Sequence, residues 1–142
     1  MIIHAERPAC GKSTLGRVIF TEQSNVVVVS NESQSARLRA CRQAIAIPDT
    51  SIIIIDHTNP SRRNRELYEL IADTRKYRVW IVKHLLSQEC YKYLNRYRAY
   101  TEKREATPSA AYDKFDAEFE EPSEEDGRIV PYLSWVSICT YY

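Results

Sequence analysis

The amino-acid sequence predicts an α/β fold, a three-layer sandwich in which helices cover both faces of a mostly parallel sheet. Three observations carry this prediction. Four short runs rich in β-branched residues, at 2–5, 26–29, 52–55 and 79–82, are almost entirely apolar, as strands buried on both faces are. A stretch with helical spacing of its apolar residues follows each run. The 142 residues suit one compact core, so we expect the single domain 1–142.

The helices are located by their apolar stripes and by their ends. Pro48 and Asp49 should end the second helix, while Ser61 and Ser87 are typical residues to cap the third and fourth. The last strand is expected within 128–138. The residues expected to face the core are, in helix order, Leu15, Val18 and Ile19; Leu38, Cys41 and Ile45; Leu67, Leu70 and Ile71; and Cys90, Leu94 and Tyr97.

The composition is that of an ordinary globular chain, with 44% hydrophobic and 27% charged residues and a net charge of +1. No apolar run approaches the ~20 residues that span a bilayer, and the N-terminus does not resemble a secretion signal. We therefore expect an intracellular protein, in cytoplasm or nucleus, with no membrane partner. The four cysteines are scattered and the three histidines isolated in sequence, which favours reduced thiols and argues against a zinc site.

Charge is distributed unevenly along the chain. Arg and Lys dominate 62–104, whereas Asp and Glu dominate 113–126. Tyrosines are interleaved with basic residues in YKYLNRYRAY, at 91–100. That pattern suits contact with the phosphates and bases of nucleic acid, or else a solvated helix whose tyrosines pack on the core. The acidic stretch is expected to be a solvated surface or a flexible connection.

Ligands of parallel α/β sheets bind beyond the carboxyl ends of the strands. The loops after Ala5, Val29, Ile55 and Val82 should therefore form the site. The first of these loops ends in GKST, the last part of the phosphate-binding motif G-x-x-x-x-G-K-[ST]. It also lies between a predicted strand and a predicted helix, as the motif requires.

The phosphate loop supplies groups for binding ATP. Lys12 would reach the β- and γ-phosphates, and the Ser13 hydroxyl would hold Mg²⁺. The motif's first glycine is replaced by Glu6, and Ala9 stands where glycine is common. The residues expected to bind the nucleotide through backbone N–H groups or side chains are Ala9, Cys10, Gly11, Lys12, Ser13 and Thr14.

Two carboxylates follow buried strands. Asp56 ends the third strand, where an acidic residue commonly supports Mg²⁺ and its waters; capping of the next helix is the alternative. Glu32 is the carboxylate in the loop after the second strand, where it would accept the proton of a hydroxyl nucleophile. An equally simple role for Glu32 is interaction with the dipole of the following helix.

An arginine late in the fourth helix completes the set. If Cys90, Leu94 and Tyr97 form the buried face, Arg96 projects elsewhere and can close over the phosphates. Its guanidinium would stabilise the charge of a loose phosphoryl-transfer transition state.

With these residues, the chain resembles the kinase domain of polynucleotide 5′-kinases, phosphotransferases with a P-loop kinase-like fold and a small helical lid, here about 87–110. The segment DHTNP, at 56–60, is similar to the family's D-x-T-N-P, and Arg65 falls where several members have arginine. LNRYR resembles the lid segment N-x-R, with Arg96 as the lid arginine. The region 108–127 resembles the segment after the lid in the animal enzymes.

This resemblance implies ATP- and Mg²⁺-dependent transfer of the γ-phosphate to the 5′-hydroxyl end of DNA or RNA, in end repair beside a phosphatase or ligase. The roles it implies are catalytic for Lys12, Glu32 and Arg96; nucleotide-binding for Arg96 together with the phosphate loop; metal-binding for Ser13 and Asp56; and substrate-binding for Arg37, Arg39, Asp56 and Asn59.

The departures from the family pattern gather in the predicted active site. Glu6 and Ala9 lie in the phosphate loop, and Glu32 stands where the family has a catalytic aspartate. Two alternatives to the 5′-kinase therefore stay open. One is a pseudo-kinase that binds nucleotide or nucleic acid without turnover, and the other is a small P-loop kinase that acts on another hydroxyl.

Overall fold

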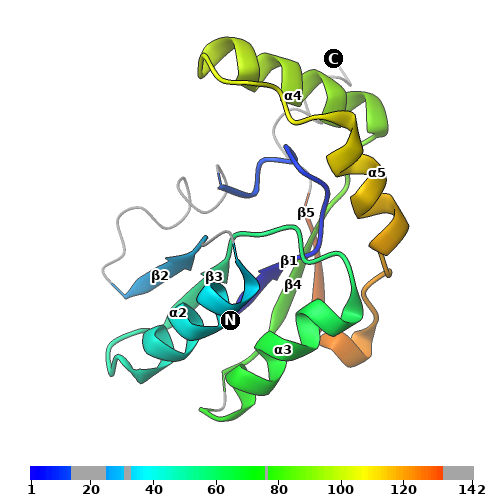
Figure 1. Ribbon diagram of the computed structural model, residues 1–142. Coiled ribbons are helices and arrows are strands. Elements are labelled where there is room, and N and C mark those ends of the chain that lie inside the picture. The colour runs from blue at the N-terminus through cyan, green and yellow to red at the C-terminus, as the bar shows by residue number, and fades with distance from the viewer. Residues whose placement is uncertain (14–24, 31–32, 76, 133–142) are drawn as a thin grey trace.

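The computed structural model describes residues 1–13, 25–30, 33–75 and 77–132, and it confirms the α/β fold class (Figure 1). Five strands form a sheet in the order β2-β3-β1-β4-β5, and every pair of neighbours is parallel. The strands are β1 (Ile2–His4), β2 (Val26–Val29), β3 (Ile52–Ile55), β4 (Trp80–His84) and β5 (Arg128–Tyr132). The β-branched runs predicted from the sequence thus pair as expected, and the remainder of the expected last strand lies outside the described residues.

The helices fall into two groups (Figure 1). Helices α2 (Gln34–Ala46) and α3 (Arg62–Asp73) pack side by side against the sheet. Helices α4 (Gln88–Thr101) and α5 (Ser109–Glu118) lie beyond the carboxyl ends of the strands. The helix expected at Leu15, Val18 and Ile19 lies outside the described residues. None of the described helices is long and apolar enough to cross a membrane.

Local sequence explains where the helices begin. The Ser61 hydroxyl accepts a hydrogen bond from the Asn64 amide, and the Ser87 hydroxyl accepts one from the Cys90 amide, both at 3.3 Å. Both predicted caps are therefore confirmed. Each satisfies one of the amide groups that the first turn of a helix leaves without a partner.

The core lies between the sheet and the pair α2–α3. Ile3, Ile53 and Ile55 are completely buried there, together with Cys41 and Tyr68. The prediction that strand 26–29 is buried on both faces is wrong for Val28, whose side chain is 47% exposed. Strand β2 is one of the two outer strands of the described sheet, and β3 is its one neighbour there.

Two of the predicted helix faces are wrong in part, although Ile71 faces the core as expected. Leu70 is 69% exposed, and the buried face of α3 consists of Arg65, Tyr68, Ile71 and Ala72. In α4 the buried residues are Tyr91 and Asn95, whereas Tyr97 is 54% exposed. Polar side chains form these buried faces because distant segments supply partners for them, and apolar periodicity cannot anticipate such partners.

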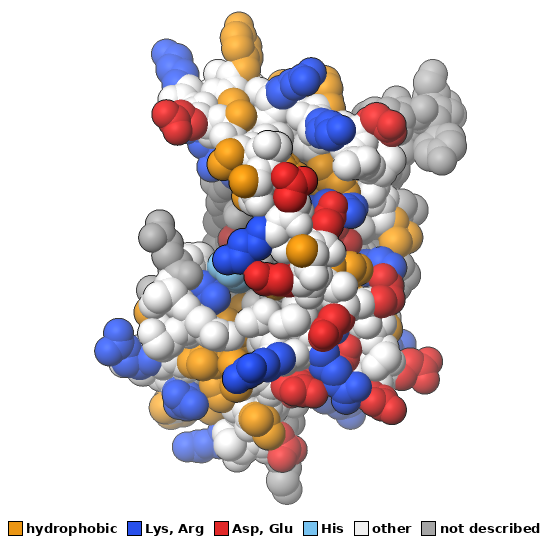
Figure 2. All heavy atoms as spheres, turned by 45° about the vertical axis from the view of Figure 1, so that its right-hand side comes forward, with side chains coloured by type: hydrophobic (Ala, Val, Ile, Leu, Met, Phe, Trp, Pro, Cys, Tyr) orange, Lys and Arg blue, Asp and Glu red, His pale blue; other side chains and the backbone are white. Residues whose placement is uncertain are grey.

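The acidic stretch 113–126 is folded. It forms the C-terminal part of α5 and a 3₁₀ turn, η1 (Glu124–Asp126). The expected solvated surface is confirmed for most of its carboxylates, which gather over this region in Figure 2. Asp126 is the exception, because its side chain is only 2% exposed.

Candidate phosphate-binding site

The phosphate loop between β1 and residue 13 has two left-handed backbone positions. Gly11 has a φ of 92° and Ala9 a φ of 63°. A residue with a Cβ in that conformation costs roughly 1–2 kcal/mol. Alanine in place of glycine at position 9 therefore strains the loop.

The Lys12 amine lies within the curve of this loop. Its Nζ donates hydrogen bonds to the carbonyl oxygens of Arg7 at 2.6 Å and Glu6 at 3.4 Å, and its side chain is only 8% exposed. These carbonyl oxygens carry no net charge, whereas a phosphate oxygen is negatively charged and attracts the ammonium group more strongly. An anionic phosphate oxygen at the loop can therefore compete with these carbonyls for the amine.

A cavity of about 360 Å³ opens in front of the loop. Its walls come from the ends of β1, β2 and β3 and from the region of α4, as expected for a parallel sheet. Three cations and one carboxylate line it, which makes it suitable for an anion. The charged and hydroxyl-bearing residues that line it are Lys12, Ser13, Ser30, Asp56, Thr58, Arg98, Arg104 and Thr107.

Glu6 does not line this cavity. Its carboxyl group turns toward α4, where Oε2 accepts hydrogen bonds from the Tyr91 hydroxyl at 2.6 Å and the Arg7 amide at 3.0 Å. Burial raises the pKa of Glu6, and these two hydrogen bonds act in the opposite direction. The unusual residue at the start of the motif therefore holds α4, and its carboxyl group is directed away from the cavity.

Arg7 adds one contact to α5 and a second one to α4. Its Nε forms an ion pair with Oδ1 of Asp116 in α5 at 2.7 Å. Its guanidinium carbon lies 5.4 Å from the centre of the Tyr91 ring, a cation–π distance. The phosphate loop is thus connected to both α4 and α5.

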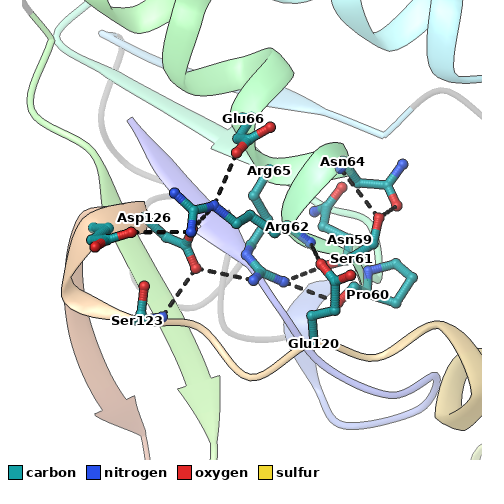
Figure 3. Close-up of polar contacts among 11 residues, drawn as sticks. Asn59, Pro60, Ser61, Arg62, Asn64, Arg65, Glu66, Glu120, Ser123 and Asp126 are labelled. Atoms are coloured by element: carbon teal, nitrogen blue, oxygen red, sulfur yellow. Dashed lines mark hydrogen bonds and ion pairs between the residues drawn. The ribbon is translucent and has the colours of Figure 1, made fainter.

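The turn after β3 is held from inside the molecule (Figure 3). Asn59 has a φ of 40°, and its Nδ2 donates to the carbonyl oxygens of His4 at 2.9 Å and His57 at 3.1 Å. The fully buried Arg65 donates to the Pro60 carbonyl oxygen at 2.9 Å and to Oδ2 of Asp126 at 3.0 Å. Arg65, which the family resemblance singled out, thereby fixes the turn that carries Asp56.

The histidines are close in space although they are isolated in sequence. His4 and His84, on neighbouring strands, face each other with 3.3 Å between Nδ1 and Nε2. Burial, with the charge of Lys12 nearby, lowers the pKa of His4 to about 3 and that of His84 to about 4. Burial and the charges of Arg37 and Lys12 lower the pKa of His57 to about 4. All three imidazoles are therefore neutral at pH 7, and the described residues contain no cluster of three or more potential metal ligands.

The predicted site residues divide into three groups. Lys12, Ser13 and Asp56 line the same cavity, together with the backbone of residues 9–11. Arg37 is buried beside Tyr68, whose hydroxyl accepts a hydrogen bond from its Nε at 3.0 Å. Thr14 and Glu32 lie outside the described residues, so their roles remain predictions.

A second cavity of about 330 Å³ adjoins the first and shares Pro8, His57 and Thr58 with it. Arg37 and Asn59 line it, although the Asn59 amide group is bound to backbone carbonyls. Arg39 is exposed and lines neither cavity. Lys114 and Phe115 of α5 complete the wall, and sequence reasoning did not identify either of them.

Arg96, the expected lid arginine, is exposed and does not line the phosphate cavity. Arg98 and Arg104 line it instead, and Glu102 pairs with both, at 3.4 Å and 3.1 Å. The difference follows from the buried residues of α4, Tyr91 and Asn95, which Arg98 follows at the helical spacing i, i+4, i+7. The signal that could have identified Arg98 is its heptad spacing from Tyr91.

Comparison with known proteins gives one similar curated sequence, and no protein-family profile matches the chain. A bifunctional polynucleotide phosphatase/kinase of Schizosaccharomyces pombe is 25% identical over 121 residues. That alignment covers 84% of this chain and 29% of the relative, so the chain spans less than a third of the relative's length.

Solved structures share the fold at low sequence identity. A fungal RNA kinase superposes with a TM-score of 0.67 at 16% identity, over 92% of this chain and 37% of that one. Kti12 of Chaetomium thermophilum in complex with ADP-AlF3 gives a TM-score of 0.70 at 15% identity, over 98% and 93%. The APS kinase CysC of Mycobacterium tuberculosis, in complex with AMPPNP and APS, gives 0.57 at 10%, over 99% and 92%. The P-loop kinase-like fold predicted from the sequence is therefore confirmed.

Proposed function

We propose that this protein transfers the γ-phosphate of ATP to the 5′-hydroxyl end of DNA or RNA. One observation carries the proposal: Lys12, Ser13, Asp56 and an arginine of the lid helix converge on one cavity in a P-loop kinase-like fold. The similarity to a polynucleotide phosphatase/kinase supports the choice of a nucleic-acid end as the acceptor.

The cavity fits Mg-ATP by the chemistry of its residues. The Ser13 hydroxyl and the Asp56 carboxylate are oxygen donors of the kind that Mg²⁺ prefers, and they line the same cavity as Lys12. When bound, Mg²⁺ neutralises charge on the phosphate oxygens. Lys12 then binds the β- and γ-phosphates, and the loop amides orient the triphosphate.

Arg98 is our candidate for the transition-state arginine. Its guanidinium lies at the cavity on the helix that Glu6 and Tyr91 hold against the phosphate loop. A fixed cation at the transferring phosphoryl group stabilises the charge that spreads over its oxygens. Arg104 lines the same wall and adds positive charge there.

The second cavity is our candidate for the acceptor. Its volume of about 330 Å³ is in the range of small-ligand sites. Arg37 and Lys114 supply cations for the phosphate of the end nucleotide, and Phe115 and Pro8 supply apolar surface. Glu32 remains the proposed general base of this reaction. Asn59 and Arg39 remain proposed substrate contacts, but the geometry supports them least, because the Asn59 amide group is bound to a backbone carbonyl and Arg39 is exposed.

Three observations favour a pseudo-kinase as the second candidate. Ala9 strains the loop, the Lys12 amine is bound by carbonyls of its own loop, and a glutamate replaces the usual first glycine. A protein of this kind would bind nucleotide or nucleic acid without turnover. In either case a phosphatase or ligase that acts on the same ends is the partner we propose.

Incubation with Mg-ATP and a 5′-hydroxyl oligonucleotide tests the proposal. We expect 5′-phosphate to form. Lys12→Ala should weaken ATP binding by at least about 1.5 kcal/mol, the value of a hydrogen bond to a charged group. Arg98→Ala should lower the rate about 10²- to 10³-fold, as the loss of one transition-state donor does.

Arg63→Ala is the matched control for Arg98, since Arg63 is an exposed helical arginine that lines neither cavity. Its rate should equal that of the parent. Binding of ATP without any 5′-phosphate formation would replace the kinase with the pseudo-kinase. Transfer to a small-molecule hydroxyl alone would replace the nucleic-acid acceptor.

A further inference from the structure

We propose that the outer face of α4 is a binding surface for single-stranded nucleic acid, separate from the two cavities. This surface, the tyrosine stripe, consists of Tyr93, Tyr97 and Tyr100 with the flanking cations Lys92 and Arg96. The inference rests on the proposed function, which makes nucleic acid the substrate. It adds that the substrate is an unpaired strand.

The three tyrosines lie on one side of the helix. Their spacing, i, i+4 and i+7, places them in one row about 10 Å long. They are 60%, 54% and 85% exposed, so none of them packs on the core. Large aromatic side chains in a row on the surface mark a binding site, whereas single ones need no explanation.

The rings are arranged as a stacking surface. Tyr93 and Tyr97 are nearly parallel, at 17°, with 6.2 Å between their ring centres. Every nucleobase has a flat face that stacks on an aromatic ring, so such a row binds unpaired bases without selecting their sequence.

The charge around the rings is complementary to phosphate. Lys92 and Arg96 are exposed, and neither forms an ion pair with any residue that the structure describes. By contrast, Glu102 engages Arg98 and Arg104 on the cavity side. Glu89 is the one carboxylate within α4, so the helix carries a positive excess. Basic and hydrophobic side chains also lie together at the top of the molecule in Figure 2, over α4.

An unpaired strand fits this surface better than a duplex does. In a duplex the faces of the bases are stacked on each other, and only phosphates and groove edges are accessible. The tyrosine stripe and Arg98 lie on opposite sides of α4. A strand that extends from the cavity to the stripe therefore has to cross one helix diameter, roughly 10–12 Å. The stripe thus binds nucleotides beyond the one that reacts.

Fluorescence anisotropy without ATP tests the surface directly. The probe is a 5′-hydroxyl oligonucleotide of about 12 nucleotides, the length that such sites cover, labelled at its 3′ end. Tyr93→Ala and Tyr97→Ala should each raise the Kd about five-fold or more. Arg96→Ala should weaken binding and reduce its dependence on salt. Tyr97→Phe keeps the ring and should bind as the parent does.

Leu70→Ala is the control for a large exposed hydrophobic residue elsewhere, and its Kd should not change. Equal affinities of the parent and both alanine variants would overturn the inference. So would tighter binding of a blunt duplex, or binding of anionic lipid vesicles in place of the oligonucleotide. Lys12→Ala should lose phosphate transfer and still bind the strand. If the parent protein binds the strand but transfers no phosphate, that result contradicts the proposed kinase function and leaves the binding surface standing.

Discussion

Two sets of contacts hold the walls of the phosphate cavity. The Arg65–Asp126 pair and the Glu6–Tyr91 hydrogen bond are buried, whereas the Arg7–Asp116 ion pair is partly exposed. The Arg65–Asp126 pair, which fixes the turn after β3, joins side chains that are 0% and 2% exposed. The contacts from the phosphate loop to the lid join Glu6 to Tyr91 and Arg7 to Asp116. In the Arg7–Asp116 pair the side chains are 31% and 40% exposed.

This difference separates the buried contacts of the turn and of α4 from the partly exposed contact of α5. Breaking a buried ion pair leaves a charge without solvent, so Arg65 and Asp126 have to remain paired as long as the protein is folded. Water replaces the partners of a half-exposed pair at little cost. The turn that carries Asp56 is therefore fixed, and the buried Glu6–Tyr91 hydrogen bond holds α4 in the same way, whereas the contact from the loop to α5 is one that a bound ligand can rearrange.

Loss of the buried pair should have the largest effect on stability. Asp126→Ala leaves the Arg65 guanidinium buried without its carboxylate, which should lower the free energy of unfolding by about 3–5 kcal/mol. Urea denaturation followed by circular dichroism measures this. Glu125→Ala, which removes an exposed neighbour on the same turn, should leave the midpoint nearly unchanged.

A double variant distinguishes charge from other roles of Asp126, which also accepts a hydrogen bond from the Ser123 amide. Replacement of both partners by apolar residues, Arg65→Met with Asp126→Leu, should recover much of the loss. If the double variant is as unstable as Asp126→Ala, the backbone contact, and not the charge pair, holds the turn.

The lid contact should have an intermediate effect. Tyr91→Phe keeps the ring and removes the donor to the Glu6 carboxylate, which should lower the free energy of unfolding by about 1.5–3 kcal/mol at pH 7. The loss should shrink as the pH falls through the raised pKa of Glu6, because the hydroxyl stabilises mainly the charged carboxyl.

Tyr93→Phe, two residues away on the outer face of α4, should not change stability at any pH. An equal effect of both tyrosine variants would show that the hydroxyl of Tyr91 does not anchor the lid. A loss for Tyr91→Phe that grows toward low pH would contradict the role of the Glu6 charge.

The sequence predicts the sheet and the phosphate loop because their signals are local. Uniform β-branched runs mark buried parallel strands, and Lys12 and Ser13 belong to one short motif in a strand–helix context. The sequence did not indicate that Arg98 lines the cavity, because both faces of α4 carry tyrosines and arginines. Only the buried face distinguishes Arg98 from Arg96, and that face depends on tertiary contacts.

The partners of the buried polar groups lie far apart in the chain. Tyr91 lies 85 residues from Glu6, Asp126 lies 61 residues from Arg65, and His84 lies 80 residues from His4. No periodicity links such positions, since hydrophobic spacing reports only which side of an element is apolar. The replacement of glycine by Glu6 was visible in the sequence, but its effect depended on where the carboxyl group turned.

The weakest contact should be the pair between Arg7 and Asp116. Both side chains are partly exposed, so Asp116→Ala should lower the free energy of unfolding by only about 0.2–1 kcal/mol. Added salt should reduce the difference, because it screens exposed charges. Asp113→Ala, on the same helix and also exposed, is the control and should not differ from the parent. A salt-independent loss above about 2 kcal/mol would place this pair with the buried contacts and remove the distinction between the two kinds of contact.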